Sequence, residues 1–376
     1  METCDVLIAG GGPAGSTCAW ALRKAGLDVM VVDRSSFPRD KVCAGWITTQ
    51  VAAELELDLD AYGQGRTLQA ITGFRTGVIG RERDVEIEYG RPVSYGIRRC
   101  EFDDYLLRRS GARVELGAPV TTLRREGGCW IVNDQLRASM LVGAGGHFCS
   151  VAQHVNGPPA ALDGSALVVA REAEFAIGPG DAALFTTRPE TPELFFSQDL
   201  KGYGWCFRKQ GYVNVGFGSL DRHLLPQATS DFTTFLARRG TIPARRNWPW
   251  RGHAYLLHEQ TPRRIVGEGL VLIGDAAGLA YPRSGEGIRP AIESGLIAAS
   301  TIVEAEGRYT CDRLEPYQSR LRRRLGASTP PALSRLLPPA ALASCARLLL
   351  GVPLFVRHIV LDRWFLHAHD SALAVS

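Results

Sequence analysis

The chain has 376 residues, of which 45% are apolar and 22% are charged, and its formal net charge is +4. This composition is typical of a folded protein with enough apolar material for two cores, and it excludes a disordered chain or a nucleic-acid-binding tail. The nine cysteines form no CxxC pair and the histidines do not cluster at metal-ligand spacing. We therefore expect a reduced, cytoplasmic chain, no metal and no nucleic-acid partner.

No apolar run reaches the roughly 18 residues that would span a bilayer. The first residues lead directly into a strand pattern without a basic leader, so no signal peptide is expected. We expect a protein that is soluble or peripheral to a membrane.

The N-terminal elements are predicted to be a strand, a glycine turn, a helix and a second strand. Residues 6–9 (VLIA) form a short apolar run suited to a buried parallel strand. The turn at 10–15 leads into a helix that Gly26 ends in the usual C-terminal glycine position. Residues 29–32 (VMVV) form the second strand, and Asp33 closes it.

The glycine turn has the spacing of a dinucleotide cradle. In GGGPAG, Gly10 permits the tight turn, Gly12 lets the backbone approach a pyrophosphate, and Gly15 lets the helix pack on the strand. The helix N-terminus favours phosphate charge. Asp33 lies where an acid binds a ribose hydroxyl and would repel the 2′-phosphate of NADP. The competing interpretation is a glycine turn without a ligand.

The hydrophobic pattern of the sequence changes twice along the rest of the chain. Residues 166–219 alternate β-branched or aromatic with polar residues, which predicts antiparallel sheet. Residues 270–273 (LVLI) form another buried strand, and apolar residues at spacings of three and four predict a long helix over 288–303. We predict a nucleotide-binding domain at 1–60, 95–165 and 262–312, a sheet domain at 61–94 and 166–261, and C-terminal helices at 313–376.

A second glycine-acid turn favours FAD over NAD as the bound dinucleotide. Gly274-Asp275 follows the strand at 270–273, and the segment 284–288 (SGEGI) then opens the long helix. A carboxylate there accepts hydrogen bonds from a ribityl chain, and the helix start stabilises the charge of a reduced flavin. NAD has no ribityl chain. The alternative for Asp275 is an ordinary helix cap.

Together these residues resemble the flavoprotein class built like 4-hydroxybenzoate hydroxylase, and within it the geranylgeranyl reductase family. Residues 37–46 (FPRDKVCAGW) are similar to that family's FPRDKxCGGW segment. Residues 203–207 (YGWCF) with 216–218 (GFG) resemble its YxWxFP…GxG motif, and 282–288 (PRSGEGI) resembles its PxTGEGI turn. Arg208 stands where the family has proline, which predicts a cation near the substrate cavity.

The resemblance implies an α/β fold: a Rossmann-like FAD-binding domain, an inserted antiparallel substrate sheet and a helical C-terminus. It also implies NAD(P)H or a ferredoxin-like protein as transient electron donor, because no second nucleotide cradle is apparent. The residues it assigns to FAD are Gly10, Gly12, Pro13, Ala14, Gly15, Asp33, Arg34, Cys43, Ala44, Arg99, Val120, Gly274, Asp275, Gly285, Gly287 and Ile288.

The implied activity is reduction of C=C bonds in an isoprenoid or similar hydrophobic substrate by hydride from reduced flavin. Such a step also needs a proton, and the candidate donors are Cys43, Tyr203 and Tyr281. The alternative for Cys43 is an inert buried thiol. The predicted substrate-binding residues are Trp46, Tyr203, Trp205 and Phe207, although the same alternation also suits a plain sheet core.

Three alternatives remain open from the sequence. A monooxygenase or, less well matched, a halogenase acting on an aromatic or polyketide substrate would share the fold and FAD. A flavin protein that only senses or shuttles electrons is the non-enzymatic alternative. Residues 333–367, rich in Leu, Ala and Arg, either contact an anionic membrane or cap the substrate cavity. The sequence does not predict the oligomeric state.

Overall fold

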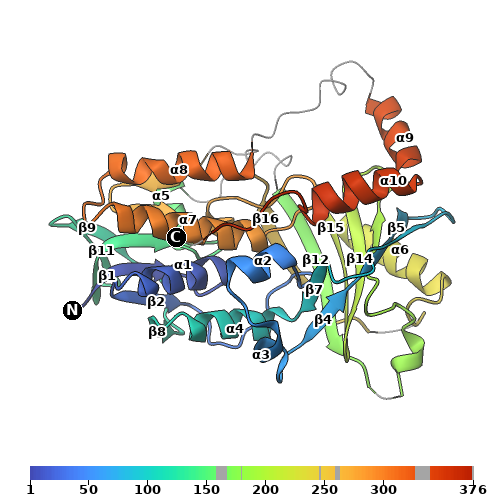
Figure 1. The fold of residues 1–376 in the computed structure, drawn as a ribbon, viewed down its shortest axis with the longest axis horizontal. Coiled ribbons are helices and arrows are strands. Elements are labelled where there is room, and N and C mark those ends of the chain that lie inside the picture. The colour runs from blue at the N-terminus through green and yellow to red at the C-terminus, as the bar shows by residue number, and fades with distance from the viewer. Residues whose placement is uncertain (158–166, 179, 245–246, 259–262, 327–338, 375–376) are drawn as a thin grey trace.

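A computed structural model describes residues 1–157, 167–178, 180–244, 247–258, 263–326 and 339–374. The predicted domain boundaries at 165/166 and 261/262 and residues 333–338 of the predicted membrane segment lie outside the described residues. Figure 1 shows an α/β part beside a large sheet, with the C-terminal helices passing from one to the other.

The nucleotide-binding sheet is built from both ends of the chain. Its central strands are parallel, as predicted from their continuous apolar runs. The late strand at 270–272 pairs with one from the middle of the chain, which in turn pairs with the first strand. The strand order is β17 (Val266–Gly267), β18 (Leu270–Leu272), β11 (Leu136–Gly143), β1 (Glu2–Ala9), β2 (Val29–Asp33) and β8 (Arg113–Leu116), with β10 (Cys129–Val132) and β9 (Leu123–Glu126) added to β11.

Helices on this sheet position the cofactor turns. Helix α1 (Pro13–Lys24) ends before Gly26, whose φ of +87° is the left-handed geometry predicted for its C-terminus. Helix α7 (Ile288–Glu304) crosses α1 closely, because a Cβ at Gly295 would lie 2.6 Å from Ala14 O. The other helices here are α2 (Thr49–Glu54), α3 (Leu59–Gly63), α4 (Arg99–Arg109), α5 (Ser150–Asn156) and α8 (Cys311–Leu325).

The second sheet has seven strands and forms the far wall of the cavity described below. Its order is β16 (Arg251–Leu256), β12 (Leu167–Ala176), β15 (Tyr212–Ser219), β14 (Gly202–Lys209), β13 (Glu193–Phe196), β5 (Gly73–Val78) and β6 (Val85–Glu88). Its pairs are antiparallel except that of β13 with β5, which is parallel. That pair joins strands distant in sequence, so alternation along either strand could not reveal its direction. Helix α6 (Leu225–Arg238) packs on one face.

A small third sheet connects these two parts. It pairs β3 (Trp46–Thr48) with β7 (Ser94–Ile97) and β7 with β4 (Leu68–Ile71). The C-terminal region contains α9 (Pro339–Leu349), α10 (Pro353–Phe355) and a π-helix at Val356–Phe365. The predicted fold class is therefore confirmed: a Rossmann-like domain with an inserted, largely antiparallel sheet and a helical C-terminus.

Candidate active site

One large cavity, of about 480 Å³, lies between the two main sheets, and we call it the central cavity. Its volume is in the range of small-molecule sites. Glycine turns line one end and aromatic side chains line the other. The predicted site residues that line it are Gly10, Gly12, Pro13, Ala14, Asp33, Arg34, Cys43, Ala44, Trp46, Arg99, Val120, Tyr203, Trp205, Phe207, Asp275, Gly285, Gly287 and Ile288.

The first glycine turn has the geometry of a dinucleotide cradle. Gly10 has a φ of +122°, and a Cβ there would lie 2.4 Å from Ala144 O. A Cβ on Gly15 would lie 1.9 Å from Gly10 O, so Gly15 lies behind the cavity wall and allows α1 to begin against the turn. Asp33 accepts hydrogen bonds from the amides of Gly11 and Ser35, both at 2.8 Å.

Two arginines add positive charge beside this turn. The Arg99 guanidinium binds Asp103 through two bonds of 2.8 and 2.9 Å, which fixes it against the cavity wall. Arg39 lies 3.3 Å from Asp103 Oδ2, and its Nη2 would lie 3.3 Å from a Cβ on Gly12. This charge, together with the helix N-terminus, suits a pyrophosphate.

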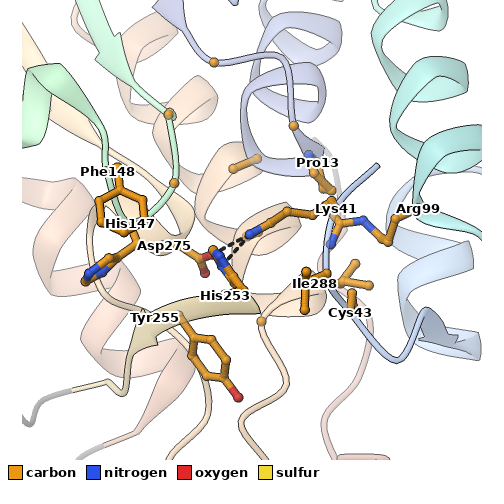
Figure 2. Close-up of a pocket in the computed structure, with 18 of the residues that line it drawn as sticks. Pro13, Lys41, Cys43, Arg99, His147, Phe148, His253, Tyr255, Asp275 and Ile288 are labelled. Carbon is orange, nitrogen blue, oxygen red and sulfur yellow. Dashed lines mark hydrogen bonds and ion pairs between the residues drawn. The ribbon is translucent and has the colours of Figure 1, made fainter. Parts of the chain in front are cut away.

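The second turn places a carboxylate next to two basic groups (Figure 2). Asp275 Oδ2 lies 3.7 Å from His253 Nε2 and 3.9 Å from Lys41 Nζ, and these two nitrogens also contact each other. Burial raises the pKa of Asp275, but the His253 hydrogen bond and the Lys41 charge outweigh it and bring that pKa to about 2. Burial lowers the pKa of Lys41 to about 8. Asp275 is therefore ionised and can accept hydrogen bonds from a polyol.

Cys43 lies in a tight turn at the middle of the central cavity. Its thiol accepts a hydrogen bond from the Gly45 amide at 3.4 Å. Its own amide donates to Glu172 Oε2 at 2.6 Å, and its carbonyl accepts from Asn214 Nδ2 at 3.0 Å. Burial raises the pKa of Glu172 to about 7. Two side chains of the large sheet thus fix this turn of the nucleotide-binding part.

The aromatic end of the cavity is a continuous set of ring contacts. The Trp46 ring lies 5.1 Å from Phe207 and 5.8 Å from Phe365 between centroids, and Phe365 lies 5.3 Å from Tyr203. The Tyr203 hydroxyl donates to Ser284 O at 2.5 Å, and burial raises its pKa. Its proton is therefore directed to the backbone rather than into the cavity.

Three predicted site residues lie outside the cavity lining. Gly15 and Gly274 act from behind it: Gly274, with a φ of +59°, would place a Cβ 3.0 Å from that of Ala14. The third is Tyr281, the predicted proton donor near the flavin. Its ring stacks on His367, with centroids 3.7 Å apart, which turns it toward the C-terminal segment.

The prediction of a cation from Arg208 near the substrate cavity is also wrong. Residues 203, 205 and 207 line the cavity, so the alternate residue Arg208 faces the other side of β14. There its guanidinium donates to Phe185 O at 3.3 Å. The aromatic end of the cavity gains no charge from this substitution.

Several lining residues were missed by the sequence reasoning. His253 and Tyr255 come from β16, and Phe365 comes from the C-terminal π-helix. No motif marks them, because only the folding of distant segments brings them to the cavity. Lys41 and Arg39 lie inside the segment 37–46 that carried the resemblance, so this match held the signal.

The comparisons with known proteins agree with this geometry. A family model described as "FAD dependent oxidoreductase" matches residues 5–82. The menaquinone reductase of Mycobacterium tuberculosis is 31% identical over 332 residues, covering 80% of this chain and 77% of that protein. The chain belongs to the geranylgeranyl reductase family of FAD-dependent oxidoreductases.

Two further comparisons agree with this family assignment. A geranylgeranyl diphosphate reductase of Rhodobacter capsulatus is 28% identical over 311 residues, covering 78% of this chain and 74% of that protein. A geranylgeranyl bacteriochlorophyll reductase-like protein of Thermoplasma acidophilum shares the fold, with a TM-score of 0.74, 23% identity, and 94% and 88% coverage of the two chains.

FAD fits the central cavity on the residues present. The cradle admits no Cβ at Gly10 or Gly15, and ionised Asp275 can accept from a ribityl chain. When bound, FAD supplies a hydride donor and acceptor at its ring. The chain's own residues that would hold the two ends are Asp33 and Arg39 at the cradle, and Asp275 with the start of α7 at the second turn. This FAD-dependent family member is an oxidoreductase.

Proposed function

We propose that this protein reduces C=C bonds of an isoprenoid or a similarly hydrophobic substrate by hydride transfer from reduced flavin. The observation that carries the proposal is the shape of the central cavity, which joins the dinucleotide cradle to an aromatic floor. That floor is Trp46, Leu194, Tyr203, Trp205, Phe207 and Phe365. A prenyl chain fits such a lining, since it buries apolar area without requiring polar partners.

The test is an anaerobic incubation of the dithionite-reduced holoenzyme with prenyl diphosphates, prenylated quinones and aromatic polyketides, followed by mass spectrometry. We expect a gain of two mass units on a prenyl substrate. The absence of this gain on every prenyl substrate would count against the proposal.

The alternative activity is FAD-dependent monooxygenation, or halogenation, of an aromatic or polyketide substrate. Oxygen separates the two chemistries, because a monooxygenase consumes oxygen in step with product and a reductase works without it. The aromatic floor gains no charge from Arg208, and an uncharged floor favours the reductase. We propose NAD(P)H or a ferredoxin-like protein as the electron donor, and stopped-flow reduction of bound FAD by each donor tests this choice.

Cys43 is proposed to protonate or position the alkene. Its thiol lines the cavity beside the aromatic floor, whereas the Tyr203 proton is directed to Ser284 and Tyr281 lies outside the lining. We expect Cys43→Ser to lower turnover about 10²-fold, the lower end for losing a general acid, with FAD still bound. Cys129→Ser, a half-buried thiol on β10, is the control. Unchanged turnover in Cys43→Ser would remove the thiol from the mechanism.

We further propose that the C-terminal helices bring the protein to a membrane. Among the described residues, no single helix has the length and apolar character to cross a bilayer, although the bent pair Ala343–Leu349 and Pro353–Phe365 meets these criteria jointly. Two of the leucines near this bend, Leu348 and Leu354, are 68% and 70% exposed. The buried half of the pair caps the cavity through Phe365.

Pelleting with anionic liposomes tests the membrane proposal. Replacing both Leu348 and Leu354 by Asp should lower the bound fraction at least fivefold, because apolar burial is lost and negative charge is added. Leu184→Asp with Leu224→Asp removes two exposed leucines elsewhere and is the matched control. Equal binding by the two double variants would contradict the proposal.

A further inference from the structure

Asn214 lies at the centre of a buried polar network between the two main sheets. Its side chain, on β15, is fully buried. Its amide nitrogen donates to Cys43 O at 3.0 Å and to Glu174 Oε2 at 3.1 Å, and it lies 3.3 Å from Glu172 Oε2. Its amide oxygen accepts from Trp205 Nε1 at 2.7 Å. One side chain therefore contacts both the Cys43 turn and the aromatic floor.

Glu172 completes the grip on the Cys43 peptide. Its carboxylate accepts from the Cys43 amide, while Asn214 holds the carbonyl of the same residue. Both backbone groups of Cys43 are therefore bound by side chains of the large sheet. No helix or strand ladder fixes this turn, so these bonds hold the thiol's position.

One carboxylate of this network, Glu174, is bound by two cations. Lys209, which is fully buried, donates to Glu174 at 2.8 Å and to Ile97 O at 2.9 Å. Arg98 Nε lies 3.2 Å from Glu174 Oε1. Two cations thus bind Glu174, which allows this buried carboxylate to persist in the network.

The Cys43 turn is also closely packed on the side that faces β7. Gly45, with a φ of +66°, would place a Cβ 2.4 Å from both Ile97 O and Lys209 Nζ. The Gly45 carbonyl also accepts from the Ile97 amide at 2.8 Å. The turn is therefore held between β7 on one side and the Asn214 network on the other.

We propose that Asn214 is a positioning residue that couples the aromatic floor to the Cys43 turn, so that the side chain holding Trp205 also sets where the thiol lies. This inference rests on the proposed function for its catalytic consequence. The coupling itself is a property of the holoenzyme without substrate. A purely structural role for Asn214 would change stability without changing the environment of Cys43.

Alkylation of Cys43 by iodoacetamide in the FAD-loaded protein tests the coupling, with the rate at each cysteine followed by peptide mass spectrometry. We expect Asn214→Leu to raise the Cys43 rate at least fivefold relative to the Cys129 rate, and to alter the visible circular dichroism of bound FAD. Val213→Ala, which opens space on the opposite face of β15, is the control for lost stability. Val213→Ala should leave the Cys43 alkylation rate and the visible circular dichroism of bound FAD within twofold of the wild type.

Glu172→Leu is the second variant, and it decides the matter if Asn214→Leu does not fold. Leucine offers no acceptor to the Cys43 amide or to Asn214 Nδ2, so we expect the same change in Cys43 alkylation at smaller amplitude. Rates within twofold of the wild type in the folded variants would overturn the coupling. Because no substrate is present, this outcome is independent of whether the protein reduces an alkene.

Discussion

Gly15→Ala should yield a folded but colourless protein. The new Cβ would lie 1.9 Å from Gly10 O and 3.2 Å from the Ala144 Cβ, so the turn must move away from the helix start. A cradle of this geometry would bind a pyrophosphate through backbone amides, so a shift of this size would remove several hydrogen bonds at once. We expect FAD affinity to fall at least a hundredfold, measured by fluorescence titration of the apoprotein.

The matched control for this variant is Gly211→Ala. A Cβ at Gly211, in the turn between β14 and β15, meets nothing within 4 Å. The Gly211→Ala protein should be yellow when purified and should bind FAD with wild-type affinity. The clash with Gly10 O also costs stability, so far-UV circular dichroism of Gly15→Ala must show that the variant is folded. A yellow Gly15→Ala protein whose affinity lies within fivefold of the wild type would show that this turn does not bind the cofactor.

Arg289→Met should cause the largest loss of stability. Arg289 is 1% exposed, and its Nε lies 2.8 Å from Glu293 Oε1. Its guanidinium also donates to the backbone carbonyls of His367, Asp370 and Ser371 in the C-terminal segment. The variant breaks this buried pair and leaves the three carbonyls without this donor, at a cost of about 3–5 kcal/mol, although Arg324 still binds Glu293 at 2.7 Å. Urea unfolding measures this loss.

Arg320→Met is the control for Arg289→Met. Arg320 pairs with Glu304 at 2.6 Å, but both side chains are at least 36% exposed. An exposed pair of this kind contributes about 0–1 kcal/mol. Similar losses in the two variants would mean that the Arg289 cluster is not a buried charge network.

The loss in Arg289→Met should depend on pH. Burial and the neighbouring Glu293 already raise the pKa of Glu54 above its ordinary value. A carboxyl whose pKa is raised by folding binds its proton more tightly in the native state, so acidification favours the native state. Without Arg289 this effect grows. We therefore expect the difference from the wild type to be larger at pH 8 than at pH 5, with the wild type measured in parallel.

The turns at the nucleotide-binding site could be predicted because their chemistry is local. Gly10, Gly12 and Gly15 occur within six residues, and a tight turn before a helix requires glycine at those positions. Asp33 is the last residue of β2, and Asp275 comes three residues after the end of β18, so the ends of these strands fix the places of both acids. All of these residues except Gly15 line the central cavity.

Side-chain direction limited the prediction for Tyr281 and Arg208. Each lies close in sequence to true lining residues, yet Tyr281 turns to stack on His367 and Arg208 faces the opposite side of β14. For Arg208, the alternation of side chains along a strand was sufficient to predict that it faces away from Trp205 and Phe207. In Tyr281 the partner lies 86 residues later in the chain, and no local pattern announces it.

The sequence by itself determined the fold class, the cradle and the family, because glycine turns, strand ends and contiguous motifs depend on residues that are neighbours along the chain. The tertiary structure alone decided that His253 and Phe365 meet at one cavity, and that Asn214 joins Trp205 to Cys43. The bond between Asn214 and Cys43 and the meeting of His253 with Phe365 each join positions more than a hundred residues apart. They arise from packing two sheets against each other, and the packing of distant surfaces leaves no periodic mark in either segment.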